Sequence, residues 1–182
     1  FALVRTKLQA ACQTISSLRL KSQALEIPLL RECLELAARA PYCDRPGIAP
    51  YRLACLLLLE PDQAEQHFEQ LRDQWLSKLD FYPRREQRDL LRIGLNYCVS
   101  RINAGRQDYL QPTLDLYQTA LDLELVYEGG YISPFTFDNI LGIALRLGED
   151  DWAESFLQRE APQLPKELQA PLLALNLARL AL

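Results

Sequence analysis

Apolar residues recur along this chain at the spacing of α-helices and almost nowhere at the alternating spacing of β-strands. One clear series keeps the i, i+4, i+7, i+11 spacing of a single helical face: Leu91, Leu95, Cys98 and Ile102. Two further series of this kind begin at Leu110 and Phe137. No Asn-Gly or Asp-Gly dipeptide marks a hairpin between strands. The pattern predicts an all-α fold.

Prolines and glycines divide the pattern into segments. We expect helices over residues 2–20, 23–39, 50–59, 62–80, 85–104, 108–127, 134–147, 150–161 and 165–181. Four prolines each stand just before an apolar run: Pro28, Pro61, Pro134 and Pro165. They are expected to mark helix starts, because a proline in the first helical turn loses no hydrogen bond. Ser133 is expected to cap the helix that follows it. Residues 41–50 and 129–130 are expected to be irregular connections.

Part of the chain repeats after 43 residues. Two matching series show the offset: Asn96, Gly105, Tyr109 and Leu114, followed by Asn139, Gly148, Trp152 and Leu157. A fixed period of this size predicts stacked supersecondary units. Each glycine should end a helix in the left-handed conformation, and each aromatic residue should fill the space between two helices. Asp108 and Asp150 or Asp151 are expected to cap the second helices.

The second copy resembles a tetratricopeptide repeat. Five residues match the family's features in order: Phe137, Gly148, Trp152, Ala153 and Pro165. The resemblance covers residues 134–165, with a weaker echo over 90–122. It implies antiparallel helix hairpins stacked as an α-α superhelix, here one domain over residues 1–182. HEAT-like or other helical repeats stay open, since the period exceeds that of the tetratricopeptide family.

The sequence offers few groups for chemistry. It holds one histidine, His67, and no phosphate-binding glycine motif or nucleophile motif. A lone helical histidine is typically a surface or packed residue. The acids Glu149, Asp150, Asp151 and Glu154 could provide an acid–base pair, but stabilisation of a helix N-terminus is the stronger interpretation. We therefore expect no catalytic residues, no cofactor and no metal, so the chain is not an enzyme; an accessory domain of a larger enzyme is the remaining catalytic alternative.

The family resemblance also implies a binding surface. In tetratricopeptide repeats the first helices line a concave groove, where an asparagine often bonds a bound peptide. Asn96 and Asn139 occupy this place, with Arg92 and Phe135 one turn earlier and Arg146 two turns after Asn139. The expected partner is a peptide or another protein. Alternatively, both asparagines satisfy backbone groups between helices.

A basic stretch provides a second candidate surface. Arg84, Arg88 and Arg92 share one helical face, with Arg85 beside them. This face could bind RNA or a phosphate-bearing ligand, or it could be a solvated face relieved by neighbouring acids. The formal net charge of −4 argues against nucleic acid.

The five cysteines include no C-x-x-C pair, which favours buried, reduced thiols over disulfides or a zinc site. We therefore expect a cytoplasmic protein, and no apolar run is long enough to span a membrane. Because the chain starts at Phe1 and lacks methionine, we expect a fragment of a longer polypeptide. Homo-oligomerisation is left open.

Overall fold

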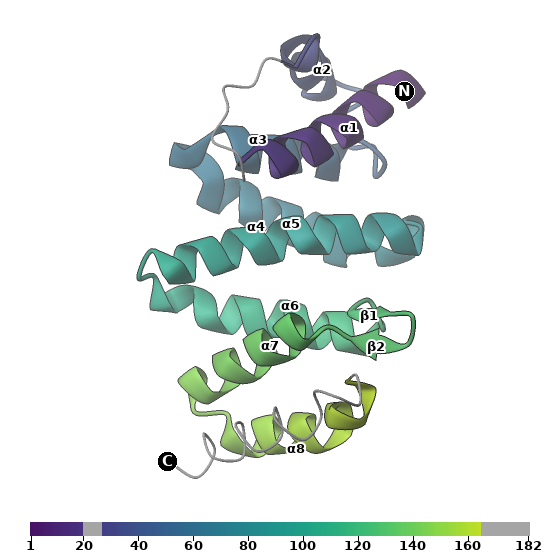
Figure 1. The fold of residues 1–182 in the computed structure, drawn as a ribbon. Coiled ribbons are helices and arrows are strands. Elements are labelled where there is room, and N and C mark those ends of the chain that lie inside the picture. The colour runs from purple at the N-terminus through teal and green to yellow at the C-terminus, as the bar shows by residue number, and fades with distance from the viewer. Residues whose placement is uncertain (20–26, 165–182) are drawn as a thin grey trace. The chain divides into compact units, whose positions relative to one another are not determined.

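The computed structural model describes residues 1–19 and 27–164, which are mostly helical (Figure 1). The all-α prediction is therefore confirmed at the level of fold class. The predicted helix over 165–181 lies outside the described residues. Contacts divide the chain into two compact units, Phe1–Tyr97 and Cys98–Leu182, and the division falls within one helix. Each unit is described by itself.

The first unit is built on three packed helices. Its elements are α1 (Ala2–Arg19), α2 (Leu30–Ala37), α3 (Ala49–Leu59), η1 (Pro61–Gln63), α4 (Ala64–Leu76), η2 (Leu79–Phe81) and the start of α5 (Arg84–Asn103). Helix α3 packs against both α1 and α4, and α2 packs against α1. Helix α3 is apolar nearly all round, with Leu53, Ala54 and Leu57 buried, as expected of a helix enclosed by others.

Two predicted helices of this unit are shorter in the structure. Residues 23–26 of the helix predicted over 23–39 lie outside the described residues, and its described part is α2, which begins at Leu30 after Leu29 in the left-handed region at φ 63°. Ile27 is not helical, which is expected because a proline disfavours helical geometry in the residue before it. The helix predicted over 62–80 divides into η1, α4 and η2, and α4 ends at Leu76.

The second unit packs two helix hairpins and a small strand pair. Its elements after α5 are η3 (Gln107–Tyr109), α6 (Leu110–Asp122), β1 (Tyr127–Glu128), β2 (Tyr131–Ile132), α7 (Pro134–Leu147), α8 (Asp150–Glu160) and η4 (Ala161–Gln163). Helix α7 packs against α6 and α8. The Phe156 ring lies 5.2 Å from that of Phe137 and 5.3 Å from that of Trp152. Phe156 therefore joins α8 to α7, and Trp152 stacks on Phe156 from the same helix.

Three helix ends in this unit share one geometry. Gly105 and Gly148 lie in the left-handed region, at φ 89° and 75°. After each, the next N–H reaches back five residues, as in the bond from Glu149 to the Ala144 carbonyl (3.0 Å). Both glycine predictions are confirmed. Helix α6 ends in the same way, but its left-handed residue is Glu124, at φ 54°.

A two-stranded hairpin follows α6 where the sequence predicted helix and an irregular break. The helix predicted over 108–127 ends at Asp122, and β1 pairs antiparallel with β2. Gly129 and Gly130 connect the strands with positive φ at both positions, the geometry of the tightest hairpin turns. The Gly-Gly pair is a sequence signal for a hairpin turn, whereas we predicted only an irregular connection at these residues.

The structure confirms one of the predicted helix caps and contradicts the others. Ser133 accepts a hydrogen bond from the Thr136 N–H (3.1 Å), which confirms it as the cap of α7. The aspartate caps are wrong: neither Asp108 nor Asp150 or Asp151 caps a helix, because each already lies within a helical turn. Asp108 instead accepts hydrogen bonds from Arg106, which lower the pKa of its carboxyl group.

Within the described parts of the chain, no helix has both the length and the apolar character needed to cross a membrane.

Candidate interaction surface

Helix α7 separates a buried face from an exposed one. Phe137, Ile140, Leu141 and Ala144 are all fully buried. The other face follows the same helical spacing through four residues: Phe135, Asn139, Gly142 and Arg146. Phe135 is 84% exposed, the largest value among the exposed large hydrophobic residues of the described chain. We call these four residues the α7 stripe.

Two members of the α7 stripe are held by neighbouring elements. The Arg146 guanidinium donates a hydrogen bond to the Gln107 side chain (2.7 Å). The Asn139 amide hydrogen bonds the Tyr117 hydroxyl of α6, which partly offsets the rise that burial causes in the Tyr117 pKa. Asn139 therefore contacts a neighbouring helix through a side chain, whereas the alternative interpretation expected a backbone group. Both residues remain exposed to solvent.

Gly142 has no structural requirement for glycine within the described residues. It lies in the middle of α7 with ordinary helical geometry, and an added Cβ would meet no atom within 4 Å. A glycine inside a helix costs about 0.5–1 kcal/mol relative to alanine. The α7 stripe therefore lacks a side chain between Asn139 and Arg146, and internal packing does not explain this absence.

Arg92 and Asn96 lie one turn apart on α5, and both are exposed. They belong to the first unit, whereas the α7 stripe belongs to the second. Arg92 forms an ion pair with Asp89 at 3.1 Å, with its side chain 64% exposed. The two asparagines that the sequence paired are therefore each exposed on their own helix.

The predicted basic face lies on the same helix. Arg84, Arg85 and Arg88 are exposed on the first turns of α5. The acids expected to relieve them behave differently from each other. Asp89 pairs with Arg92 as expected, but Glu86 points inward and is 9% exposed. Of these two acids, Asp89 is therefore the one that lies beside an arginine of the basic face, Arg92.

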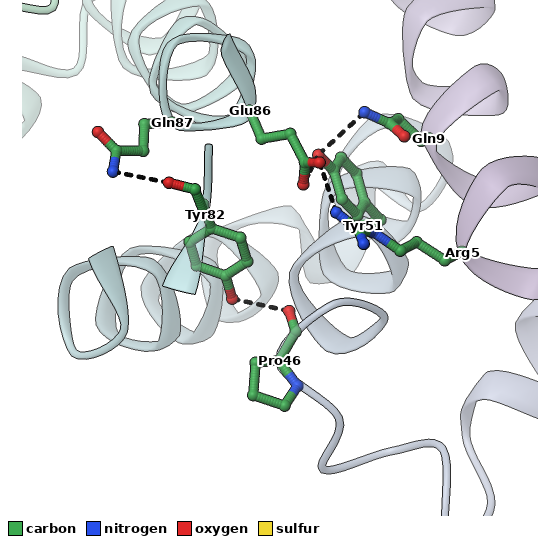
Figure 2. Close-up of polar contacts among 7 residues, drawn as sticks. All are labelled: Arg5, Gln9, Pro46, Tyr51, Tyr82, Glu86 and Gln87. Carbon is green, nitrogen blue, oxygen red and sulfur yellow. Dashed lines mark hydrogen bonds and ion pairs between the residues drawn. The ribbon is translucent and has the colours of Figure 1, made fainter. Parts of the chain in front are cut away.

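The inward-pointing Glu86 belongs to a polar cluster that the sequence analysis missed (Figure 2). Its carboxylate accepts hydrogen bonds from the Tyr51 hydroxyl (2.8 Å) and from the Arg5 guanidinium. Gln9 in turn donates to the Tyr51 oxygen (3.3 Å). We call Arg5, Gln9, Tyr51 and Glu86 the Glu86 cluster. A signal was present, because Glu86 shares one helical face with the buried Leu90 and Ile93.

The Glu86 cluster shifts the pKa values of its members. The hydrogen bond to Glu86 raises the Arg5 pKa above its usual value. Burial, and then the hydrogen bond to Glu86, raise the Tyr51 pKa well above 10.0. Nearby, burial raises the pKa of Tyr82 to about 12, and its hydroxyl donates to the Pro46 carbonyl at 2.8 Å (Figure 2). These shifts hold both tyrosines neutral and Arg5 charged at neutral pH.

The histidine and the five cysteines are buried or half-buried. His67 is buried, as one of the two expected alternatives stated, and its Nε2 lies 2.9 Å from a Glu60 oxygen. Among the described residues, no three histidine, cysteine or acidic side chains gather as metal ligands. Cys12, Cys55 and Cys98 are buried and reduced, whereas Cys33 and Cys43 are half-buried.

Comparison with known proteins assigns no family to this arrangement. No family model matches the chain, and no curated protein or solved structure matches it significantly. The structure is compatible with the tetratricopeptide resemblance only in its helical content.

Proposed function

We propose that this chain is a non-catalytic interaction module of tetratricopeptide-like hairpins that binds a peptide or protein segment. The observation that carries the proposal is the α7 stripe. It combines an aromatic side chain that is 84% exposed with an amide, a glycine and a guanidinium on one helical face. Exposed aromatic and arginine side chains are the residue types that dominate binding at protein interfaces.

Each residue of the stripe suits a different part of an extended segment. Phe135 offers apolar area for a side chain, and Arg146 offers guanidinium donors for a carboxylate. Asn139 can both donate to and accept from a peptide backbone. Gly142 lets that backbone approach the helix closely, which explains a residue that internal packing does not require. Arg92 and Asn96, on α5 in the first unit, form a separate candidate surface.

The test begins with ligands selected from a displayed peptide library against the full chain. The affinity of one selected peptide is then measured by calorimetry for the variants Phe135→Ala, Arg146→Ala and Gly142→Ala. We expect each of the first two to weaken binding by about tenfold or more, as for residues of an interface centre. Glu154→Ala, an exposed change on α8, is the matched control.

Two results would contradict the proposal. One is that no peptide is selected. The other is that a selected peptide binds all the variants, including Arg92→Ala and Asn96→Ala, as tightly as the unchanged chain. Unfolding curves recorded for each variant separate a lost contact from a lost fold.

A second candidate function is binding of RNA or another phosphate-bearing ligand on the basic face. The observation in its favour is the exposure of Arg84, Arg85 and Arg88 while Glu86 points inward. Filter binding of single-stranded RNA over a range of salt concentrations tests it. Binding that weakens with salt, and less steeply so in Arg88→Ala, would support it. Absence of salt-dependent binding removes it.

A further inference from the structure

Two cysteines meet inside the first unit. Cys12 of α1 and Cys55 of α3 place their Sγ atoms 3.2 Å apart, and the residues are 2% and 0% exposed. Each thiol also lies against a carbonyl of the opposite helix: Cys12 near that of Tyr51 (3.4 Å) and Cys55 near that of Leu8 (3.5 Å). Both sulfurs are therefore positioned by packed helices rather than by loops.

A small pocket lies against Cys12. Its volume is about 10 Å³, and its wall includes Cys12, Asp89 and the exposed side chains of Gln13 and Arg92. That volume suits a single molecule about the size of water. The Asp89 Oδ2 atom is buried and accepts no hydrogen bond from the described residues. The pocket therefore brings space for a water-sized molecule to Cys12 and Asp89.

We infer that Cys12 and Cys55 form an oxidation site, in which a small hydroperoxide converts the two thiols into a disulfide joining α1 to α3. The Cys12 sulfur first attacks one peroxide oxygen, so that the O–O bond breaks and water leaves for hydrogen peroxide. The Cys55 sulfur then displaces the hydroxyl from the oxidised Cys12, forming the S–S bond and a second water. Two electrons and two protons pass from the thiols to the peroxide, and a thiol reductant reverses the change.

The surroundings of Cys12 predict that its oxidation is slow and that the disulfide forms with Cys55 rather than with another cysteine. The hydrogen bond with Cys55 and burial raise the Cys12 pKa well above its ordinary value. Because the thiolate is the nucleophile, oxidation should accelerate as the pH rises. Cys33 lies within electrostatic range of Cys55, which makes it the competing partner to exclude. A larger oxidant such as a glutathione disulfide does not fit a pocket of this size.

The experiment uses the full chain in its folded state. After incubation with hydrogen peroxide, the chain is denatured, its free thiols are alkylated, and its mass is measured. We expect three alkylated thiols and the loss of two hydrogen masses at the other two. Digestion without reductant should then yield a linked peptide pair containing Cys12 and Cys55, and the yield should rise with pH.

Variants that each replace one cysteine test whether the disulfide joins Cys12 to Cys55. Cys33→Ser should form the disulfide at the rate of the unchanged chain, whereas Cys12→Ala should leave Cys55 alkylated after the same treatment. A linkage through Cys33, Cys43 or Cys98, or five alkylated thiols after prolonged oxidation at alkaline pH, would overturn the inference. If Cys12→Ala does not fold, the linkage found in the unchanged chain decides the question alone.

Discussion

The two units stabilise their cores in different ways. In the first, the buried Glu86 draws its partners from helices 35 and 81 residues away in the sequence. In the second, the buried Glu160 accepts a hydrogen bond from Tyr127, 33 residues away, the buried Thr113 bonds a carbonyl only four residues away, and the rest of the centre is aromatic and aliphatic. Because the Glu86 cluster joins three helices, we expect hydrogen bonding to contribute more to the first unit, and side-chain volume to contribute more to the second.

The chain carries a natural probe for this comparison. It contains two tryptophans, Trp75 in the first unit and Trp152 in the second. Replacing one with phenylalanine leaves a single fluorophore that reports the urea unfolding of one unit. Each prediction below is measured in both single-tryptophan backgrounds.

The largest effect is expected from Phe156→Ala. This side chain is 1% exposed and lies between the rings of Phe137 and Trp152. Its removal leaves a cavity, so the free energy of unfolding should fall by about 3–5 kcal/mol. The loss should appear by urea denaturation with Trp152 as the probe. Phe135→Ala on the exposed face should change stability by less than about 0.5 kcal/mol; equal losses would contradict the assignment of the two faces.

Tyr51→Phe should have the next largest effect, in the first unit. It keeps the ring but removes the hydroxyl that donates to Glu86 at 2.8 Å. Hydrogen bonds to charged groups contribute about 1.5–3 kcal/mol, so the unfolding free energy followed by Trp75 should fall by that amount. Tyr131→Phe, which alters an exposed tyrosine, is the control. A loss no greater than the control's would mean that the Glu86 cluster does not stabilise the unit.

Gly148→Ala tests the helix ends of the second unit. Its φ of 75° disfavours any side chain, although an added Cβ would meet no atom of the described residues within 4 Å. The cost is therefore conformational, about 1–2 kcal/mol in urea unfolding. Glu124→Gly, at the equivalent end of α6, should shift stability in the opposite direction. The same sign for both changes would show that φ is not the controlling term.

Tyr82→Phe should cost about 0.5–1.5 kcal/mol at neutral pH, because one hydrogen bond to the Pro46 carbonyl is lost. Its pH dependence is more informative. Burial raises the Tyr82 pKa from 10.0 to about 12, so its contribution is complete below pH 10 and is lost as the pH rises through 12. Between pH 10 and pH 12, the free energy of unfolding should fall less steeply with pH in Tyr82→Phe than in the unchanged chain. Parallel curves for the two proteins would contradict the raised pKa of Tyr82.

The smallest effect is expected from Gly142→Ala on the exposed face of α7. Since nothing among the described residues obstructs a Cβ there, the helix should become more stable by about 0.5–1 kcal/mol. Thermal unfolding compared with Ala144→Gly, a buried change on the same helix, gives the sign. Destabilisation by Gly142→Ala would indicate an internal reason for the glycine.

Local signals accounted for most of what the sequence could predict. The helix starting at Pro134 and the left-handed ends at Gly105 and Gly148 follow from the preferences of one or two residues. The left-handed Glu124 could not be found in this way, because no local preference favours glutamate there. Tertiary packing overrides propensity at that position.

The Glu86 cluster shows the limit of local inference. Its partners are brought together by folding, and no sequence spacing links Arg5 to Glu86. Asn96, Asn139 and the basic face are exposed, as their proposed roles require. Exposure by itself does not identify a binding site, because every surface residue is exposed. Binding sites depend on a ligand that the chain itself does not encode, so these roles require the experiments above.

The strand pair that interrupts the helices also provides a place to modify the chain. Gly129 and Gly130 are both exposed at the tip of the hairpin, where small residues tolerate insertions. A short epitope or a fluorescent label inserted between them would lengthen a turn without breaking a helix. Such a labelled chain would report ligand binding at the nearby start of α7 while both unit cores stay intact.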